Sequence, residues 1–257
     1  MDLKVAIRKD WPIEVISIFD KALNSLSKKD ISDIYYKWTA NKVEEKIEKH
    51  HLLNHSFYKA WNAGELNRSI IQEYAAQYFK HVSAFPRYLS SIHSNCEDIS
   101  VRQEILDNLI DEERGEENHP ELWMRFGEGM GNNRESMKNA SAIEETEALV
   151  DSFMKLSKDE RYHVGMGALY CYESMVPEIA ENKIDGLKKF YGVEDGEETL
   201  KFFEVHQHAD KWHREVVKKL LGKICDSDDK KEEALDAIDQ ALFSLNNFLS
   251  GMERVYC

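Results

Sequence analysis

The sequence predicts an all-α protein. Residues that favour helices dominate it, and only four prolines and twelve glycines occur among its 257 residues. Apolar residues recur at helical spacing in one segment after another, whereas the strict alternation typical of half-buried strands is nearly absent. Segments of this kind bury their apolar faces against one another, so we expect helices packed on helices.

Charge and composition exclude several classes of function. The net charge of −14 argues against a nucleic-acid partner, because phosphate backbones are bound by an excess of Lys and Arg. The same charge disfavours docking on an anionic membrane, and no apolar run approaches the ~20 residues that span a bilayer. The N-terminus has no apolar signal-peptide region. Four cysteines without paired spacing fit a reduced, cytoplasmic setting.

The length and the hydrophobic content of 42% allow one large domain with a real core. We expect residues 1–44 to form an N-terminal helical extension and residues 45–257 to form one helical bundle domain. No flexible linker long enough to separate further domains occurs in the chain. The residues of the extension indicate packing helices and do not reveal a function.

Helices are predicted along the whole bundle domain. In chain order they cover residues 41–61, 67–95, 100–110, 121–130, 141–156, 159–182, 200–221 and 227–255. We expect Pro86 to bend the second of them. Capping boxes are predicted at residues 100–103, 141–144 and 195–198, where a Ser or Asp precedes a Gln or Glu by three positions.

The strongest functional signal is the string His206-Gln207-His208-Ala209-Asp210-Lys211-Trp212-His213. Steps of four and seven residues return to nearly the same side of a helix, so His206, Asp210 and His213 form one row. Two imidazoles and a carboxylate are suitable ligands for a divalent first-row metal. A solvated polar stripe is the alternative, but the large apolar residues around the motif favour the metal.

Three further residues are candidate ligands. Glu112 follows the apolar face of its predicted helix, and His119 lies seven residues further on, beyond a turn with Gly115 and Pro120. This spacing is weak evidence by itself. Glu173 lies among aromatic residues in a helix that is apolar nearly all round, where a carboxylate is costly unless it is paired, protonated or bound to metal. A salt bridge explains Glu173 equally well when it is considered alone.

The combined set is Glu112, His119, Glu173, His206, Asp210 and His213. Three carboxylates and three imidazoles suit two metal ions that share a bridging carboxylate. Because the set has no thiolate, it favours Fe or Mn, with Zn as an alternative. It is richer in histidine than ferritin-type sites, which use additional glutamates.

Several longer strings accompany the ligand pattern. They are His55-Ser56-Phe57-Tyr58, Ala84-Phe85-Pro86-Arg87-Tyr88-Leu89, Asp107-Asn108-Leu109-Ile110-Asp111-Glu112-Glu113 and Ala168-Leu169-Tyr170-Cys171-Tyr172-Glu173-Ser174. With the six ligands, they resemble the CADD family (chlamydia protein associating with death domains) of haem-oxygenase-like di-iron oxidases, from about residue 45 to the C-terminus. The resemblance implies a seven-helix haem-oxygenase-like bundle, the superfamily that also holds TenA and PqqC.

The resemblance also implies a dinuclear centre of two Fe ions, or of one Fe and one Mn, that activates dioxygen in para-aminobenzoate synthesis for folate. In that family a tyrosine of the protein itself is the proposed ring source and a lysine the amino donor. The matching positions are Tyr58 and Lys183, with Tyr172 beside Glu173. Such a chain would turn over once. Lys183 follows Glu173 by ten residues, or roughly 15 Å of helix, so a contact with the ligands would need a break near Asn182 or a long reach by the lysine.

Other interpretations stay open. A TenA-like hydrolase would use Cys171 as its nucleophile, although a buried inert thiol is the simpler interpretation. A PqqC-like oxidase would work without metal, and the family name suggests a non-enzymatic death-domain-binding protein. Judged without the resemblance, Tyr58 is a core aromatic and Lys183 a solvated residue near a helix end. We expect dioxygen and a reductant as partners and a homodimer as the assembly.

Overall fold

The computed structural model describes Ser27 and residues 41–257, and for residues 208–216 it describes the backbone only. The predicted extension over residues 1–44 therefore lies almost entirely outside the described residues. The described residues contain helices and connections and no strand, which confirms the all-α prediction. A first helix covers residues 41–49. The others are η1 (Leu52–Asn54), α3 (Ser56–Ala63), α4 (Arg68–Asn95), α5 (Ile99–Glu113), α6 (His119–Gly129), α7 (Arg134–Asn139), α8 (Glu144–Ser157), α9 (Tyr162–Phe190), α10 (Lys201–Ile224) and α11 (Asp228–Tyr256).

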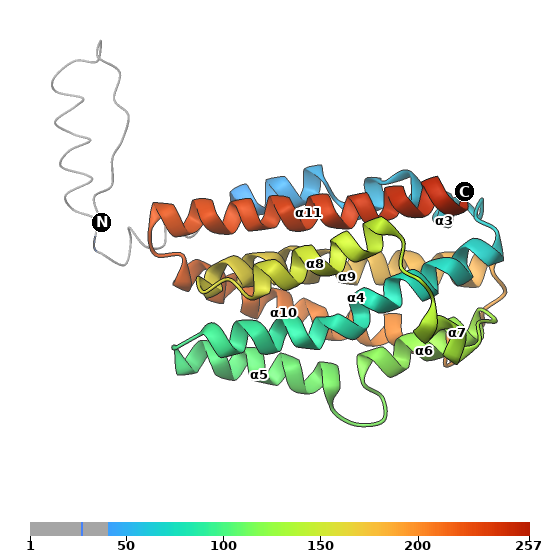
Figure 1. Ribbon diagram of the computed structural model, residues 1–257, viewed down its shortest axis with the longest axis horizontal. Helices are drawn as coiled ribbons and strands as arrows, with labels where there is room; N and C mark the ends of the chain where they lie inside the picture. The colour runs from blue at the N-terminus through green and yellow to red at the C-terminus, as the bar shows by residue number, and fades with distance from the viewer. Residues whose placement is uncertain (1–26, 28–40) are drawn as a thin grey trace, which may run out of the picture.

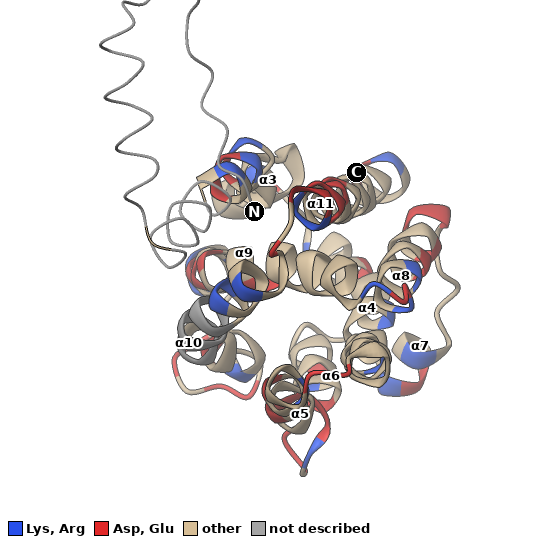
Figure 2. Cartoon of the chain, turned by 90° about the vertical axis from the view of Figure 1, so that its left-hand side faces the viewer, with Lys and Arg blue, Asp and Glu red and all other residues tan. Residues whose placement is uncertain are grey.

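The long helices run side by side along the molecule and form one bundle (Figure 1). Viewed along the bundle, α3 and α11 lie on one side and α5 and α6 on the opposite side (Figure 2). The helix α9 is the centre of the packing, since it contacts α3, α4, α8, α10 and α11. A residue on α9 can therefore meet side chains from most of the bundle.

The helix α9 is buried on nearly every side, as its sequence predicts. Two glycines on α9 permit close approach of its neighbours. A Cβ atom on Gly167 would lie 2.9 Å from the carbonyl oxygen of Ala234 in α11, and one on Gly186 would lie 2.6 Å from the ring of Trp61 in α3. Both substitutions would push a neighbouring helix away from the centre of the bundle.

The predicted segment 159–182 is too short, because α9 continues without interruption to Phe190. Lys183 is therefore in the interior of a helix and only 4% exposed, so the expectation of a solvated residue near a helix end is wrong. The helix does not break near Asn182.

The three predicted capping boxes are also wrong. The carboxylate of Asp98, not Ser100, caps α5 by accepting from the amides of Ser100 and Val101. The helix α8 follows Ile143 without a side-chain cap, and α10 begins only at Lys201. A capping pattern identifies a turn, but competing local hydrogen bonds decide where the helix starts.

The predicted helix over residues 41–61 is interrupted. The first helix ends at residue 49, η1 follows, and α3 begins at Ser56. Two histidines make the break, because the Nδ1 atom of His51 accepts from the amide of Leu53 and that of His55 accepts from the amide of Phe57. This second cap sets the start of α3 and thereby the place of Tyr58.

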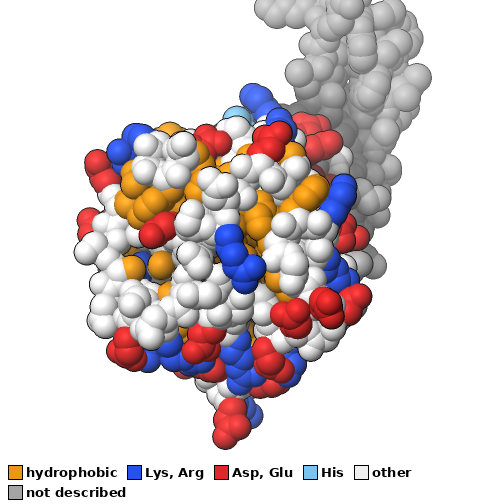
Figure 3. All heavy atoms as spheres, turned by 90° about the vertical axis from the view of Figure 1, so that its right-hand side faces the viewer, with side chains coloured by type: hydrophobic (Ala, Val, Ile, Leu, Met, Phe, Trp, Pro, Cys, Tyr) orange, Lys and Arg blue, Asp and Glu red, His pale blue; other side chains and the backbone are white. Residues whose placement is uncertain are grey.

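The surface mixes charges of both signs. Figure 3 shows acidic and basic side chains next to one another along one edge of the end of the bundle where α7 and the C-terminus lie. On α6 and α7, Arg134 pairs with Glu121 at 2.6 Å and with Glu128 at 2.7 Å. No helix among the described residues is long and apolar enough to cross a membrane.

Candidate active site

A tight turn brings the first two candidate metal ligands together. Glu112 lies in the last turn of α5, and His119 is the first residue of α6. Between them Gly115 has a φ of 86°, a conformation that favours glycine, and Asn118 donates from its side chain to the carbonyl of Gly115 at 2.8 Å. As a result, His119 Nδ1 lies 2.8 Å from Glu112 Oε1.

His206 joins this pair from α10. Its Nδ1 lies 2.5 Å from the carbonyl oxygen of Phe202, so Nδ1 carries the proton and Nε2 the lone pair. The rings of His119 and His206 have centroids 4.4 Å apart. One ligand atom from each of Glu112, His119 and His206 lies within 4.8 Å of the others, and all three residues are buried.

Glu173 on α9 is near enough to Glu112 to feel its charge, but it is not one of the three residues whose ligand atoms lie within 4.8 Å of one another. It is 4% exposed, and its Oε1 accepts a hydrogen bond from Asn108 Nδ2 at 2.7 Å. Burial raises the pKa of Glu173 to about 7, the hydrogen bond from Asn108 opposes this, and the charge of Glu112 adds to it. The Oε2 atom is buried and has no hydrogen-bond partner. A buried carboxylate oxygen in this state is costly unless the group is protonated or a cation meets it.

These residues fit a metal ion. Imidazole nitrogens and carboxylate oxygens without thiolate suit iron and manganese. His206 donates a hydrogen bond from Nδ1 to the backbone carbonyl of Phe202, and metal-bound histidines usually donate such a bond from the ring nitrogen that does not bind the metal. Burial would lower the pKa of His119, but the carboxylate of Glu112 outweighs it and the pKa is raised. A bound cation would take the place of that proton.

Two of the six predicted ligands lie outside the described side chains. Asp210 and His213 are in α10, which is continuous from Lys201 to Ile224. Their spacing from His206 therefore keeps them on the same side of this helix. Their role as ligands stays a prediction.

The structure also brings Tyr58 and Lys183 together, although 125 positions separate them in the sequence. Their meeting point is Tyr74 on α4. The hydroxyl oxygens of Tyr58 and Tyr74 lie 2.8 Å apart, and Lys183 Nζ donates to the Tyr74 hydroxyl at 2.6 Å. All three side chains are buried.

Aromatic rings surround the amine of Lys183. Its Nζ atom lies 4.7–5.9 Å from the centroids of six rings, those of Tyr58, Trp61, Tyr74, Tyr78, Trp123 and Phe203. Burial holds the pKa of Lys183 well below its ordinary value. Burial likewise raises the pKa of Tyr58. The surroundings therefore favour a neutral amine next to a protonated phenol.

Tyr172 belongs to the same cluster through a second tyrosine. Tyr78 donates a hydrogen bond to the Tyr172 hydroxyl at 3.2 Å, and the ring of Tyr78 stacks on that of Tyr74 with centroids 5.4 Å apart. The sequence did not single out Tyr74 or Tyr78. Their spacing of four residues on one amphipathic helix gave no sign of a role beyond packing.

A layer of aromatic rings separates the candidate metal ligands from the tyrosines and the lysine. The ring of Trp123 is 5.5 Å from Lys183 Nζ and 4.8 Å from the ring of Phe202. Phe202 in turn lies 4.2 Å from the ring of His206. Lys183 is therefore close to the candidate metal centre but makes no hydrogen bond or ion pair to the four candidate ligands whose side chains are described.

The thiol of Cys171 does not have the surroundings of a nucleophile. Cys171 is fully buried in α9, and burial raises its pKa. Reactive cysteines need a lowered pKa and access to a substrate. The structure therefore favours the inert thiol over a TenA-like nucleophile.

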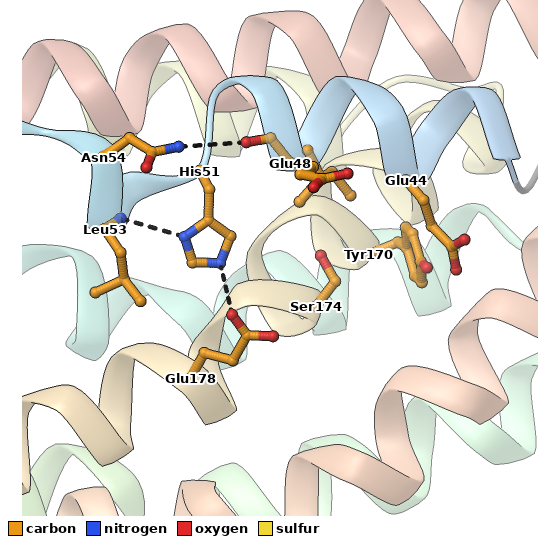
Figure 4. A pocket seen from close by; sticks show the side chains of 9 residues that line it. Glu44, Glu48, His51, Leu53, Asn54, Tyr170, Ser174 and Glu178 are labelled. Atoms are coloured by element: carbon orange, nitrogen blue, oxygen red, sulfur yellow. Dashed lines mark hydrogen bonds and ion pairs between the residues drawn. The ribbon is translucent and has the colours of Figure 1, made fainter.

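A separate pocket of about 650 Å³ lies between the first helix, η1 and α9 (Figure 4). The carboxylates of Glu44, Glu48 and Glu178 line it, and His51 Nε2 is 3.6 Å from Glu178 Oε2. None of the nine predicted site residues lines this pocket.

The bundle thus encloses a buried group of carboxylate and imidazole side chains that could hold a metal ion, as other helix bundles do in their cores. The chain belongs to the haem-oxygenase-like family of iron-containing redox enzymes, whose family model matches residues 72–245. The predicted superfamily is thereby confirmed.

Similar proteins narrow this class. A 4-aminobenzoate synthase of Nitrosomonas europaea is 44% identical over 224 residues, covering 84% of this chain and 91% of that protein. One from Chlamydia trachomatis is 40% identical over 205 residues, covering 79% and 88%. A pyrroloquinoline-quinone synthase of Klebsiella pneumoniae is 24% identical over 211 residues, covering 79% and 82%.

Solved structures share the fold. A TenA homologue from Pseudomonas syringae has a TM-score of 0.73 at 16% identity, covering 84% of this chain and 93% of that chain. A CADD-like protein of unknown function from Nostoc punctiforme has a TM-score of 0.67 at 12% identity, covering 87% and 100%. At such identities the likeness concerns the fold alone.

Proposed function

We propose that this protein is a dinuclear metal oxidase that uses dioxygen to make 4-aminobenzoate, with Tyr58 as the ring source and Lys183 as the nitrogen donor. One observation carries the proposal: both side chains meet at the hydroxyl of Tyr74, at 2.8 Å and 2.6 Å. The printed names of the relatives from Nitrosomonas and Chlamydia support the product.

The metal ions would be held by Glu112, His119, Glu173, His206, Asp210 and His213. Two Fe ions, or one Fe and one Mn, fit this set, and the iron-containing family supports iron. Bound metal supplies the one-electron and dioxygen chemistry that side chains lack. The protein supplies the position of the reacting groups and a site without bulk water.

Burial keeps the amine of Lys183 in the neutral form that a nitrogen donor needs. A charged ammonium has no lone pair, whereas a neutral amine does, and burial among aromatic rings lowers the pKa of Lys183. Tyr74 holds this nitrogen by a hydrogen bond, and the same hydroxyl contacts Tyr58. The amine and the phenol that are to be combined are thus kept in one dry compartment.

The separation of the two groups from the metal ligands is consistent with the proposal. In the proposed reaction Lys183 and Tyr58 supply atoms of the product. Neither side chain can therefore also serve as a permanent metal ligand. Trp123 and Phe202 fill the space between them and His206. A break in α9 near Asn182 is therefore not required.

Isotope labelling tests the source of the ring and of the nitrogen. Protein expressed with ring-labelled tyrosine and ¹⁵N-lysine, then given iron, reductant and dioxygen, should release doubly labelled 4-aminobenzoate. Tyr58→Phe and Lys183→Arg should release none, whereas Tyr88→Phe, which changes another buried tyrosine, should behave as wild type. Undiminished product from Tyr58→Phe would refute the assignment of the ring.

Metal analysis tests the centre independently. Wild type should bind close to two metal ions per chain, and His206→Ala or Asp210→Ala should lose at least one. Full product yield from metal-free wild type would contradict the proposal.

The dependence on dioxygen and a reductant, the homodimer and the cytoplasmic location stay predictions. Omitting each co-substrate in turn tests the first of these, and analytical ultracentrifugation tests the second. A death-domain-binding role has no support in the described residues beyond the acidic charge of the chain.

A further inference from the structure

A buried amide is bound to one of the candidate ligands. Asn108 lies on α5 and is 8% exposed, and its Nδ2 donates to Glu173 Oε1 on α9 at 2.7 Å. Glu173 is itself 4% exposed. The hydrogen bond therefore links two helices inside the bundle, away from water.

The position of Asn108 on its helix is informative. Asn108 precedes Glu112 by four residues, so the two side chains lie on the same face of α5. One face of α5 thus supplies a carboxylate to the candidate metal centre and an amide to a second carboxylate of the same centre.

The two oxygens of Glu173 are not equivalent. Asn108 occupies Oε1, whereas Oε2 is buried and has no hydrogen-bond partner. Without the amide, the carboxylate group could turn about its last bond, because such terminal torsions are broad. The amide removes this freedom and leaves Oε2 as the oxygen available to a cation.

We infer that Asn108 is a positioning residue that orients Glu173 so that Oε2 faces the metal. This inference rests on the proposed metal centre. Residues that hydrogen-bond a metal ligand fix its orientation, and their loss typically weakens metal binding by about 10- to 100-fold. Asn108 would act through Glu173, because its amide hydrogen-bonds that carboxylate.

Titration of metal-free protein with Co²⁺ tests the inference, since the absorption spectrum of Co²⁺ reports its ligand geometry. The variants are Asn108→Leu, Glu173→Ala and the control Asn95→Leu, which removes an amide that donates to the Asp159 carbonyl at 3.1 Å. We expect Asn108→Leu to bind at least one ion about 10- to 100-fold more weakly, with an altered spectrum. Asn95→Leu should match wild type in affinity and spectrum.

Each outcome decides a different point. If Glu173→Ala binds weakly but Asn108→Leu binds as wild type with the same spectrum, Asn108 has no positioning role and the metal centre stands. If wild type and Glu173→Ala bind Co²⁺ equally well, Glu173 is not a ligand and Asn108 has no ligand to orient, whereas failure of wild type to bind Co²⁺ would refute the metal centre itself. Far-UV circular dichroism of the metal-free proteins checks folding, and Asn108→Ala replaces Asn108→Leu if the latter does not fold.

Discussion

The buried carboxyl of Glu173 should make the stability of the metal-free protein depend on pH. Its pKa is raised from the ordinary value of 4.5 to about 7, chiefly by burial. The substitution Glu173→Gln keeps the shape and an oxygen acceptor for Asn108 but cannot ionise. The difference in free energy of unfolding between variant and wild type therefore isolates this one group.

The sign and the size follow from the two pKa values. The folded state binds the proton of Glu173 more tightly than the unfolded state does, so wild type loses stability as the pH rises from 4.5 to about 7. At about 1.36 kcal/mol for each pH unit, the loss is about 3 kcal/mol. Glu173→Gln avoids this loss and should become the more stable protein above pH 7.

Urea denaturation of chelator-treated protein, followed by circular dichroism at pH 4, 5, 6, 7 and 8, measures the difference. It should be small at pH 4 and should grow to about 3 kcal/mol at pH 8. Adding Mn²⁺ should reverse the order at pH 8, because only wild type retains the ligand. A difference that stays constant from pH 4 to pH 8 would show that Glu173 is not buried as an uncompensated carboxyl.

Three further substitutions test other parts of the structure. Gln77→Leu removes the acceptor of the Ile143 amide and the Thr146 hydroxyl. Urea denaturation should therefore show a free energy of unfolding that is lower by about 2–5 kcal/mol. An unchanged denaturation midpoint would contradict this prediction. Lys183→Met should stabilise the metal-free protein at pH 7 by roughly 1–4 kcal/mol, because the amine of wild type must lose its proton on folding whereas Met has none to lose. This gain should shrink as the pH rises toward 10.5, since the amine of wild type then becomes neutral in the unfolded state too; a gain independent of pH would refute the lowered pKa. Cys171→Ala should leave the yield of 4-aminobenzoate unchanged, and a loss of product in protein that remains folded would revive the nucleophile hypothesis.

The class of fold and the region of the candidate metal centre could be predicted from the sequence. Helical periodicity is a local property, so the long helices α4 and α11 agree with their predicted bounds within one or two residues. Glu112 and His206 could be proposed because a carboxylate and an imidazole are unusual beside apolar helix residues, and His119 could be proposed from its spacing to Glu112 beyond a turn. The helix starts could not be predicted, because Asp98 caps α5 in place of Ser100 and His55 caps α3 inside a segment that was predicted as one helix.

The way in which the separate segments meet depends on the packing of helices that are distant in the sequence. No periodicity relates Tyr58 and Lys183, and it is the packing of α3 and α4 on α9 that joins them through Tyr74. The same packing buries Lys183, although its neighbours in the sequence predicted a solvated side chain. It also places Asn108 against Glu173. Burial depends on contacts between helices that are distant in the chain, and it is burial that sets the charge state of the amine and the carboxyl.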